Sequence, residues 1–295
     1  MFKTLFNLVI ITSLLSCQTS SGTKAQQPVK GPFLWKVEKG GKHSWLFGTM
    51  HLGIKPDEVD PKVHKAFKES KAVRLEVDSA KMDFQAFSKL STYQGKDSLK
   101  KALTQSEWDS LLKLIPIPEA KLKTMKPFTV ISTLLVFWFA KSGLPEGRLD
   151  SYFESKAKEL GKEVEGLETA VDQLKVISRF LDISVLKHVL NDPVKNEKEA
   201  IAEIKELANL YRSGEGRDFF SSSSYPPNFN VVEYKKSLLF DRNNNWIPGI
   251  ENCIKKQTCF VAVGAAHLIG EGSVTELLKK KGYKVTRQEF TKSKK

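Results

Sequence analysis

Two distant stretches of the chain share one pattern of hydrophobic and polar positions. Trp45–Leu52 and Phe260–Leu268 each contain a short apolar run followed by a glycine, two further residues, a histidine and a leucine. The runs have the length and the residue types of buried strands. Each glycine predicts a tight turn, where the missing side chain lets backbone or ligand approach closely. We therefore expect His51 and His267 just beyond the carboxyl edge of a sheet, where open α/β sheets place ligands.

Two further strands are predicted to lead to a carboxylate. Ala72–Asp78 alternates in a way that places Glu76 near the end of an otherwise apolar strand. Lys162–Glu165 is a shorter strand that leads to Glu168. A buried carboxylate is costly unless it is paired, hydrogen-bonded or bound to a metal. Both acids are therefore candidates for a site, and a structural salt bridge is the alternative for each.

Most of the remaining chain carries helical patterns. Residues 80–160 are predicted to be mostly helical, with one helix beginning at the capping box Thr104–Glu107. The very apolar Phe128–Ala140 predicts a buried core helix, or a substrate groove, because a membrane span needs about 20 residues. Further helices are expected at Leu149–Leu160, 182–213, Val231–Phe240 and Ser273–Lys281, and a last strand at Tyr283–Phe290. The order of strand, helix and strand around His267 predicts an α/β fold.

Residues 1–16 have the pattern of a bacterial lipoprotein signal peptide, with a short apolar segment after a positive start. Leu14–Cys17 resembles a lipobox, in which the cysteine carries the lipids, and a plain secretory signal is the alternative. Residue 18 is glutamine rather than aspartate, which in such lipoproteins implies sorting to the outer membrane.

The predicted location follows from this segment. Lipid chains on Cys17 would anchor the protein in the bacterial cell envelope, at the outer membrane and facing the periplasm. Residues 17–31 are polar and read as a flexible tether, which leaves residues 32–295 as the folded domain.

The chain has 47 Lys and Arg against 34 Asp and Glu, a net charge of +13. Such an excess suggests contact with anionic surfaces. The sequence has no nucleic-acid motif, no aromatic-basic platform and no zinc-finger spacing, so we expect a solvated basic face and no nucleic-acid partner.

Cys253 and Cys259 are the remaining cysteines. In an oxidising envelope they could close a small disulfide loop. Their spacing is not Cys-x-x-Cys, which disfavours a redox or metal-binding pair.

Taken together, these motifs make the chain similar to the TraB/GumN (TIKI-like) family. The resemblance covers roughly Phe33 to Val285. It is carried by Leu46-Phe-Gly-Thr-Met-His51, Glu76 within Leu-Glu-Val-Asp, Leu149-Asp150, Gly166-Leu-Glu-Thr169 followed by Gln173, Arg242-Asn243, and Val261-Ala-Val-Gly-Ala-Ala-His267-Leu268.

The resemblance implies a mixed central β-sheet with a large helical insertion, like that of erythromycin-esterase-like and haem-binding ChaN-like proteins. The animal TIKI members of the family are metal-dependent proteases. The lipobox and the basic domain depart from those members, so the family's substrates do not carry over directly.

Two imidazoles and a carboxylate at strand ends are a suitable ligand set for a divalent transition metal such as Mn, Co or Zn. We predict His51, His267 and Glu76 as ligands, with Glu76 acting alternatively as general base. Arg242 is predicted to stabilise oxyanion charge, and Asn243 to orient substrate or Arg242. Glu168 is predicted as a second carboxylate or as the partner that fixes a histidine tautomer. The predicted reaction is hydrolysis of a peptide or small ester.

A different class of function is a non-catalytic envelope protein that binds haem, metal or a peptide signal. In that case both histidines remain ligands, and Glu76 could be replaced with little effect on binding. Either hypothesis requires that the loops at His51 and His267 converge.

Overall fold

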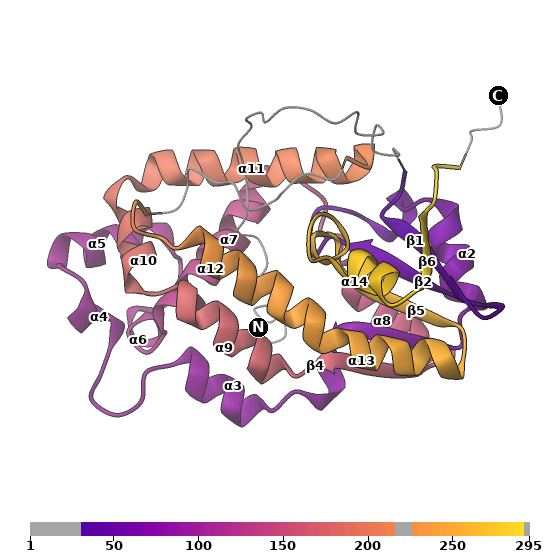
Figure 1. The fold of residues 1–295 in the computed structure, drawn as a ribbon. Coiled ribbons are helices and arrows are strands. Elements are labelled where there is room, and N and C mark those ends of the chain that lie inside the picture. Colours follow the sequence, from indigo (N-terminus) through magenta and orange to yellow (C-terminus); the bar gives the residue numbers. More distant parts are fainter. Residues whose placement is uncertain (1–30, 216–225, 292–295) are drawn as a thin grey trace.

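The computed structural model describes residues 31–215 and 226–291, so the predicted signal peptide, Cys17 and nearly all of the tether lie outside the described residues. Its centre is a mixed six-stranded sheet in the order β4-β3-β5-β2-β1-β6 (Figure 1). The strands are β1 (Leu34–Lys39), β2 (Lys42–Thr49), β3 (Ala72–Val77), β4 (Glu163–Glu168), β5 (Cys259–Gly264) and β6 (Lys284–Arg287). From β4 to β2 the neighbours are parallel, whereas β1 is antiparallel to β2 and β6. The α/β class is confirmed, and the likeness to ChaN-like proteins stays a prediction.

Helices cover both faces of this sheet. One face is covered by α2 (Pro61–Glu69) and α8 (Leu149–Glu159), and the other by α13 (Asp241–Lys256) and α14 (Val274–Lys280). Successive residues of a strand point to opposite faces. Phe260 of β5 therefore packs under α2 and α8, while Val261 packs under α13 and α14. Burial on both faces explains why β5 is apolar throughout.

A second group of helices lies beside the sheet (Figure 1). It contains α3 (Phe84–Ser91), α4 (Leu99–Ala102), α5 (Gln105–Leu114), α6 (Glu119–Leu122), α7 (Pro127–Ser142), α9 (Ala170–Phe180), α10 (Ile183–Asn191), α11 (Pro193–Ser213) and α12 (Val231–Lys235). They share one apolar core in which α7 is buried on most sides, as predicted for Phe128–Ala140. Among the helices that the structure describes, none combines the length and the apolar character needed to span a bilayer.

Short helical turns complete the fold at η1 (Pro56–Glu58), η2 (Ser79–Lys81), η3 (Lys236–Phe240) and η4 (Ala265–Leu268). The predicted helix at Val231–Phe240 is α-helical only to Lys235, because η3 is a turn of π-helix that leads directly into α13. Turns of this kind widen a helix locally and occur often at functional sites.

The helical region 182–213 is interrupted at Asp192. The Asp192 side chain accepts the backbone N–H of Lys195, and Pro193 is the first residue of α11. A capping acid followed by proline starts a new helix, since proline has no N–H to give to the preceding turn. The region 182–213 is therefore helical, as predicted, and consists of two helices, α10 and α11.

The Cys253–Cys259 disulfide is present in the structure. It joins the last turns of α13 to the first residue of β5, with the two Cα atoms 6.1 Å apart. The bridge therefore fixes the helix that carries Arg242 and Asn243 to the strand that leads to His267.

Candidate functional site

The two histidine loops converge because β2 and β5 are adjacent and parallel. Thr49 at the end of β2 is in register with Gly264 at the end of β5. A side-chain carbon added to Gly264 would lie 3.1 Å from Oε1 of Glu76 and 3.7 Å from Nε2 of His51. The same carbon would lie 3.6 Å from Cδ2 of His267. Gly264 thus forms the floor of a small space that is bordered by both imidazoles and one carboxylate.

Glu76 is buried and fully hydrogen-bonded. Its Oε1 accepts the backbone N–H of Gly264 at 2.7 Å. Its Oε2 accepts from Nη2 of Arg242 at 2.7 Å and from Nε2 of Gln173 at 2.8 Å. Burial alone would raise the pKa of this carboxyl, but the charge of Arg242 outweighs it and lowers the pKa to about 2. Glu76 is therefore a fixed negative charge at the centre of the site.

Arg242 lies in the first turn of α13, directly after the π-helical turn. It is 3% exposed and uses all five of its N–H groups. Nε and Nη2 donate to Glu168, Nη2 also donates to Glu76, and Nη1 donates to the carbonyl of Leu238 and to Nε2 of His267. Burial would lower the pKa of this guanidinium, but Glu76 and Glu168 raise it. Arg242 is therefore a permanent cation between two acids.

His267 is oriented by the residue after Arg242. Its Nδ1 lies 2.6 Å from Oδ1 of Asn243, whose Nδ2 donates to the carbonyl of Gly272. Because that bond orients the amide, we assign the hydrogen to Nδ1 of His267 and the lone pair to Nε2. Burial and the charge of Arg242 lower the pKa of His267 to about 3, so the ring is neutral. Its Nε2 is 3.1 Å from Nη1 of Arg242 and 3.8 Å from Oε1 of Glu76.

His51 is held from the opposite side. Its Nδ1 lies 2.7 Å from Oδ2 of Asp150, whose Oδ1 accepts the hydroxyl of Thr49 at 2.6 Å. The other ring nitrogen, Nε2, is buried and has no hydrogen-bond partner within residues 31–215 and 226–291. Burial disfavours a proton on this ring, but the charge and hydrogen bond of Asp150 prevail and raise the pKa to about 9.

All six predicted site residues lie in this cluster, but three have contacts that differ from the predicted roles. Arg242 has no N–H left for an oxyanion, because every donor is already used. Asn243 contacts His267 instead of a substrate or Arg242. Glu168 holds Arg242 and the indole of Trp246 rather than a histidine. Burial raises the pKa of Glu168 although Arg242 opposes it.

Sequence reasoning assigned no role to four residues that complete the cluster. Asp150 fixes His51, Thr49 fixes Asp150, and Gln173 donates to Glu76. The ring of Trp246 packs on His267, with centroids 4.4 Å apart. Asp150 and Gln173 belong to the motifs that carry the family resemblance, which is the signal that could have identified them. Nothing in the sequence pairs either one with its partner.

The donor set fits a divalent transition metal in part. Nε2 of His51 is an orphaned buried atom beside Oε1 of Glu76, and the missing side chain of Gly264 leaves space between them. Glu76 and Glu168 pair with Arg242, and Asp150 pairs with His51, so three carboxylates face two cationic groups and an added cation would balance charge.

His267 is less available than the other two predicted ligands. Its Nε2 already accepts from Arg242, so a metal would have to replace that hydrogen bond. Among the residues that the structure describes, no group of three His, Cys, Asp or Glu side chains has the geometry to coordinate one metal ion. A haem fits less well than an ion, because a single carbon added to Gly264 would already lie 3.1 to 3.7 Å from Glu76, His267 and His51, a space too small for a porphyrin.

A family model and two relatives match this chain. The model of the TraB/PrgY/gumN family matches residues 33–287. A metalloprotease TIKI homolog of Amphimedon queenslandica is 22% identical over 348 residues, covering 98% of this chain and 68% of the relative. Metalloprotease TIKI1 of Danio rerio is 22% identical over 323 residues, covering 89% of this chain and 64% of that protein. The chain thus spans about two thirds of these relatives, and no solved structure matches it significantly.

Proposed function

Because the chain belongs to the TraB/PrgY/gumN family, we propose that it is a metal-dependent hydrolase of the peptidase or esterase type. The observation that carries the proposal is the unpartnered Nε2 of His51, buried beside the fixed carboxylate of Glu76 above Gly264. A buried polar atom without a partner is costly, and a metal ion would satisfy it. The names of the TIKI relatives support a protease-like activity. We place the protein in the bacterial cell envelope, lipid-anchored through Cys17.

His51 and Glu76 would hold the metal through Nε2 and Oε1, with His267 as third ligand once Arg242 releases its Nε2. A bound Mn, Co or Zn ion would act as a Lewis acid that activates water and polarises a peptide or ester carbonyl.

The protein's own residues prepare this site. Asp150 and Asn243 each hold a proton on Nδ1 of a histidine, which leaves Nε2 as the nitrogen that would bind an ion once His51 has released its second proton. Arg242 keeps Glu76 ionised, since its guanidinium lies 2.7 Å from Oε2. Trp246 packs on His267 and Gln173 donates to Glu76, and both side chains are buried. This shell keeps His267 neutral and Glu76 charged, the protonation states that metal ligands require, whereas His51 would have to release a proton when an ion binds.

The test measures bound metal and turnover in the same preparation. Purified protein is loaded with Mn, Co or Zn, its metal content is determined, and it is incubated with libraries of peptides and small esters. We expect about one ion per chain, lost in His51→Ala and His267→Ala, and hydrolysis that disappears with the ion. His43→Ala is the matched control, because Gly40-Gly-Lys-His43 has the same spacing but lies in the exposed β1–β2 hairpin. Equal metal content in all variants would refute the ligand assignment.

A second candidate is a non-catalytic envelope lipoprotein that binds a metal or a peptide signal. It is favoured by Arg242, which has no free oxyanion donor, and by Glu76, which already accepts three hydrogen bonds and has a pKa of about 2, too low for a general base. If the protein binds metal stoichiometrically but hydrolyses no member of the libraries, the binding protein is supported and the hydrolase is not.

A further inference from the structure

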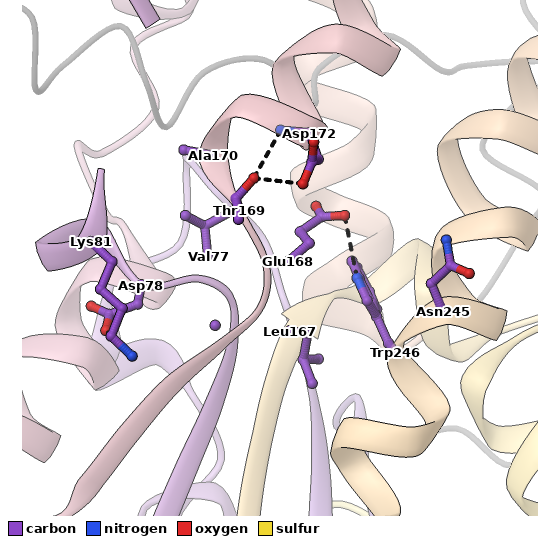
Figure 2. Close-up of a pocket in the computed structure, with 11 residues that line it drawn as sticks. Val77, Asp78, Lys81, Leu167, Glu168, Thr169, Ala170, Asp172, Asn245 and Trp246 are labelled. Carbon is purple, nitrogen blue, oxygen red and sulfur yellow. Dashed lines mark hydrogen bonds and ion pairs between the residues drawn. The ribbon is translucent and has the colours of Figure 1, made fainter. Parts of the chain in front are cut away.

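A cavity of about 500 Å³ lies at the carboxyl ends of β3 and β4. Figure 2 shows it between Asp78 and Lys81 on one side and Asn245 and Trp246 of α13 on the other, with the end of β4 passing between them. A space of this size accommodates an amino-acid side chain together with part of a backbone.

The cavity adjoins the buried cluster through two shared residues. Glu168 and Trp246 line it, and they are hydrogen-bonded to each other at 3.3 Å. Behind them, Glu168 binds Arg242, and the Trp246 ring packs on His267. A ligand in the cavity therefore contacts the two residues that bind Arg242 and pack on His267.

The strand that leads into the cavity has an open edge. β4 is the terminal strand of the sheet and pairs, among the residues described, with β3 alone. A parallel strand directs only alternate peptide groups toward its neighbour, so the other groups of β4 point outward. Its last residues, Gly166–Glu168, also line the cavity. An extended peptide that pairs with β4 would therefore place one of its residues at the cavity.

The charges of the lining indicate which side chain would enter. Asp78, Glu168 and Asp172 contribute carboxylates, and Lys81 contributes an ammonium group. Asp78 is 7% exposed, yet its ion-pair distances to Lys81 and Lys158 are 3.7 and 3.5 Å, longer than a close ion pair. A cation that enters the cavity would compete with these two loosely paired lysines for the Asp78 carboxylate, one oxygen of which also accepts the backbone N–H of Ala80.

We propose that β4 and this cavity form a peptide-binding subsite: an extended peptide pairs with the outer edge of β4 and places a basic side chain beside Asp78 and Asp172. Binding by strand addition takes affinity from main-chain hydrogen bonds and selectivity from side-chain pockets. This subsite rests on the proposed peptidase function and assigns its substrate class, peptides with lysine or arginine near the bond that is cleaved.

The experiment measures peptide binding separately from catalysis. A positional library of fluorescein-labelled, acetylated and amidated hexapeptides is titrated by anisotropy against His51→Ala, whose substituted side chain does not line the cavity. We expect the tightest members to contain Lys or Arg at one position, and exchange of that residue for Glu to weaken binding at least fivefold. Asp172→Asn is expected to reduce this preference.

Matched variants locate the bound peptide. Asn245→Trp should fill the cavity and weaken binding at least tenfold, whereas Asn244→Trp, on the adjacent residue outside the lining, should change it less than twofold. Amide hydrogen exchange should slow in β4 on binding and stay unchanged in β6, the other edge strand.

Equal effects of the two tryptophan variants, or protection elsewhere than β4, would overturn the subsite even if the wild-type protein hydrolyses peptides. Wild-type cleavage of peptides that do not bind His51→Ala would overturn it as well. Binding and protection at β4 without turnover by the metal-loaded wild type would support the subsite and refute the proposed hydrolase.

Discussion

His51 and Asp150 are 99 residues apart in sequence, and Nδ1 of the histidine lies 2.7 Å from Oδ2 of the aspartate. Asp150 is the second residue of α8, and its other oxygen accepts the hydroxyl of Thr49 at the end of β2. One carboxylate therefore fixes the imidazole and joins the strand to the helix that packs on it. This geometry leaves Nε2 of His51 as the free atom of the ring.

Asp150→Asn is expected to weaken metal binding about 10- to 100-fold. The amide can donate to Nδ1 of His51, which would move the ring hydrogen to Nε2 and remove the lone pair from the site. Affinity is measured by competition with a chromophoric chelator, and circular dichroism checks the fold. Glu154→Gln, which removes a carboxylate from the same helix, should leave the affinity within twofold. If both variants bind metal equally well, the carboxylate does not set the tautomer.

Arg242→Gln is expected to bind metal at least tenfold more tightly than the wild type. The substitution removes the N–H that occupies Nε2 of His267 and leaves Glu76 and Glu168 without their cation. For the same reason the metal-free variant should lose about 3–5 kcal/mol of unfolding free energy, and added metal should restore part of it.

The control for this substitution is Arg74→Gln. Arg74 is equally buried and also pairs with two carboxylates, Glu163 and Glu165, but these side chains are not among the site contacts. It should destabilise the protein without changing metal affinity. Weaker metal binding by Arg242→Gln than by Arg74→Gln would show that Arg242 supports the ion rather than competing with it.

The stability of the chelated, metal-free protein should be greatest near pH 6.5. Folded His51 keeps its proton to about pH 9, whereas the unfolded chain loses it near 6.5, so its pKa shift stabilises at low pH and is lost as pH rises toward 9. His267 has a folded pKa of about 3, so between pH 6.5 and 3 only the unfolded chain binds a proton at this ring. The unfolding free energy therefore decreases as the pH is lowered below 6.5. Glu76, with a folded pKa of about 2, adds a further loss as pH falls below 4.5.

Urea unfolding at pH 5, 6.5 and 9 in the presence of a chelator measures this profile. Each limb should amount to about 1–3 kcal/mol, because one pKa unit corresponds to about 1.4 kcal/mol. Asp150→Asn should flatten the alkaline limb alone. A wild-type profile that rises from pH 6.5 to 9 would contradict the assignment of His51.

Removing the disulfide should lower the unfolding free energy by about 2 kcal/mol, the loop entropy expected for a six-residue separation. The measurement compares the wild type with Cys253→Ala/Cys259→Ala in urea, each with and without reductant. Reductant should destabilise the wild type and leave the double variant unaffected. A wild type that is insensitive to reductant would show that the bridge contributes no stability.

The local patterns of the sequence predict the parts of the site well, since each depends on a few neighbouring residues. The apolar runs before Gly48 and Gly264 predict strands that end at His51 and His267, and alternation in Ala72–Asp78 predicts a buried Glu76. The helical patterns do not show where one helix ends and the next begins, as at Asp192. They also do not show the π-helical turn before Arg242.

By itself, the sequence determined the α/β class, the strand-end positions of the histidines and acids, and the family, because strand length, turn glycines and apolar periodicity are local properties. Only the tertiary structure decided that Asp150 faces His51, that Arg242 lies between two acids with every donor already used, and that β4 lies at an open edge. Those relationships join residues up to 166 positions apart, as between Glu76 and Arg242. They follow from which strands become neighbours, and no local pattern encodes that choice.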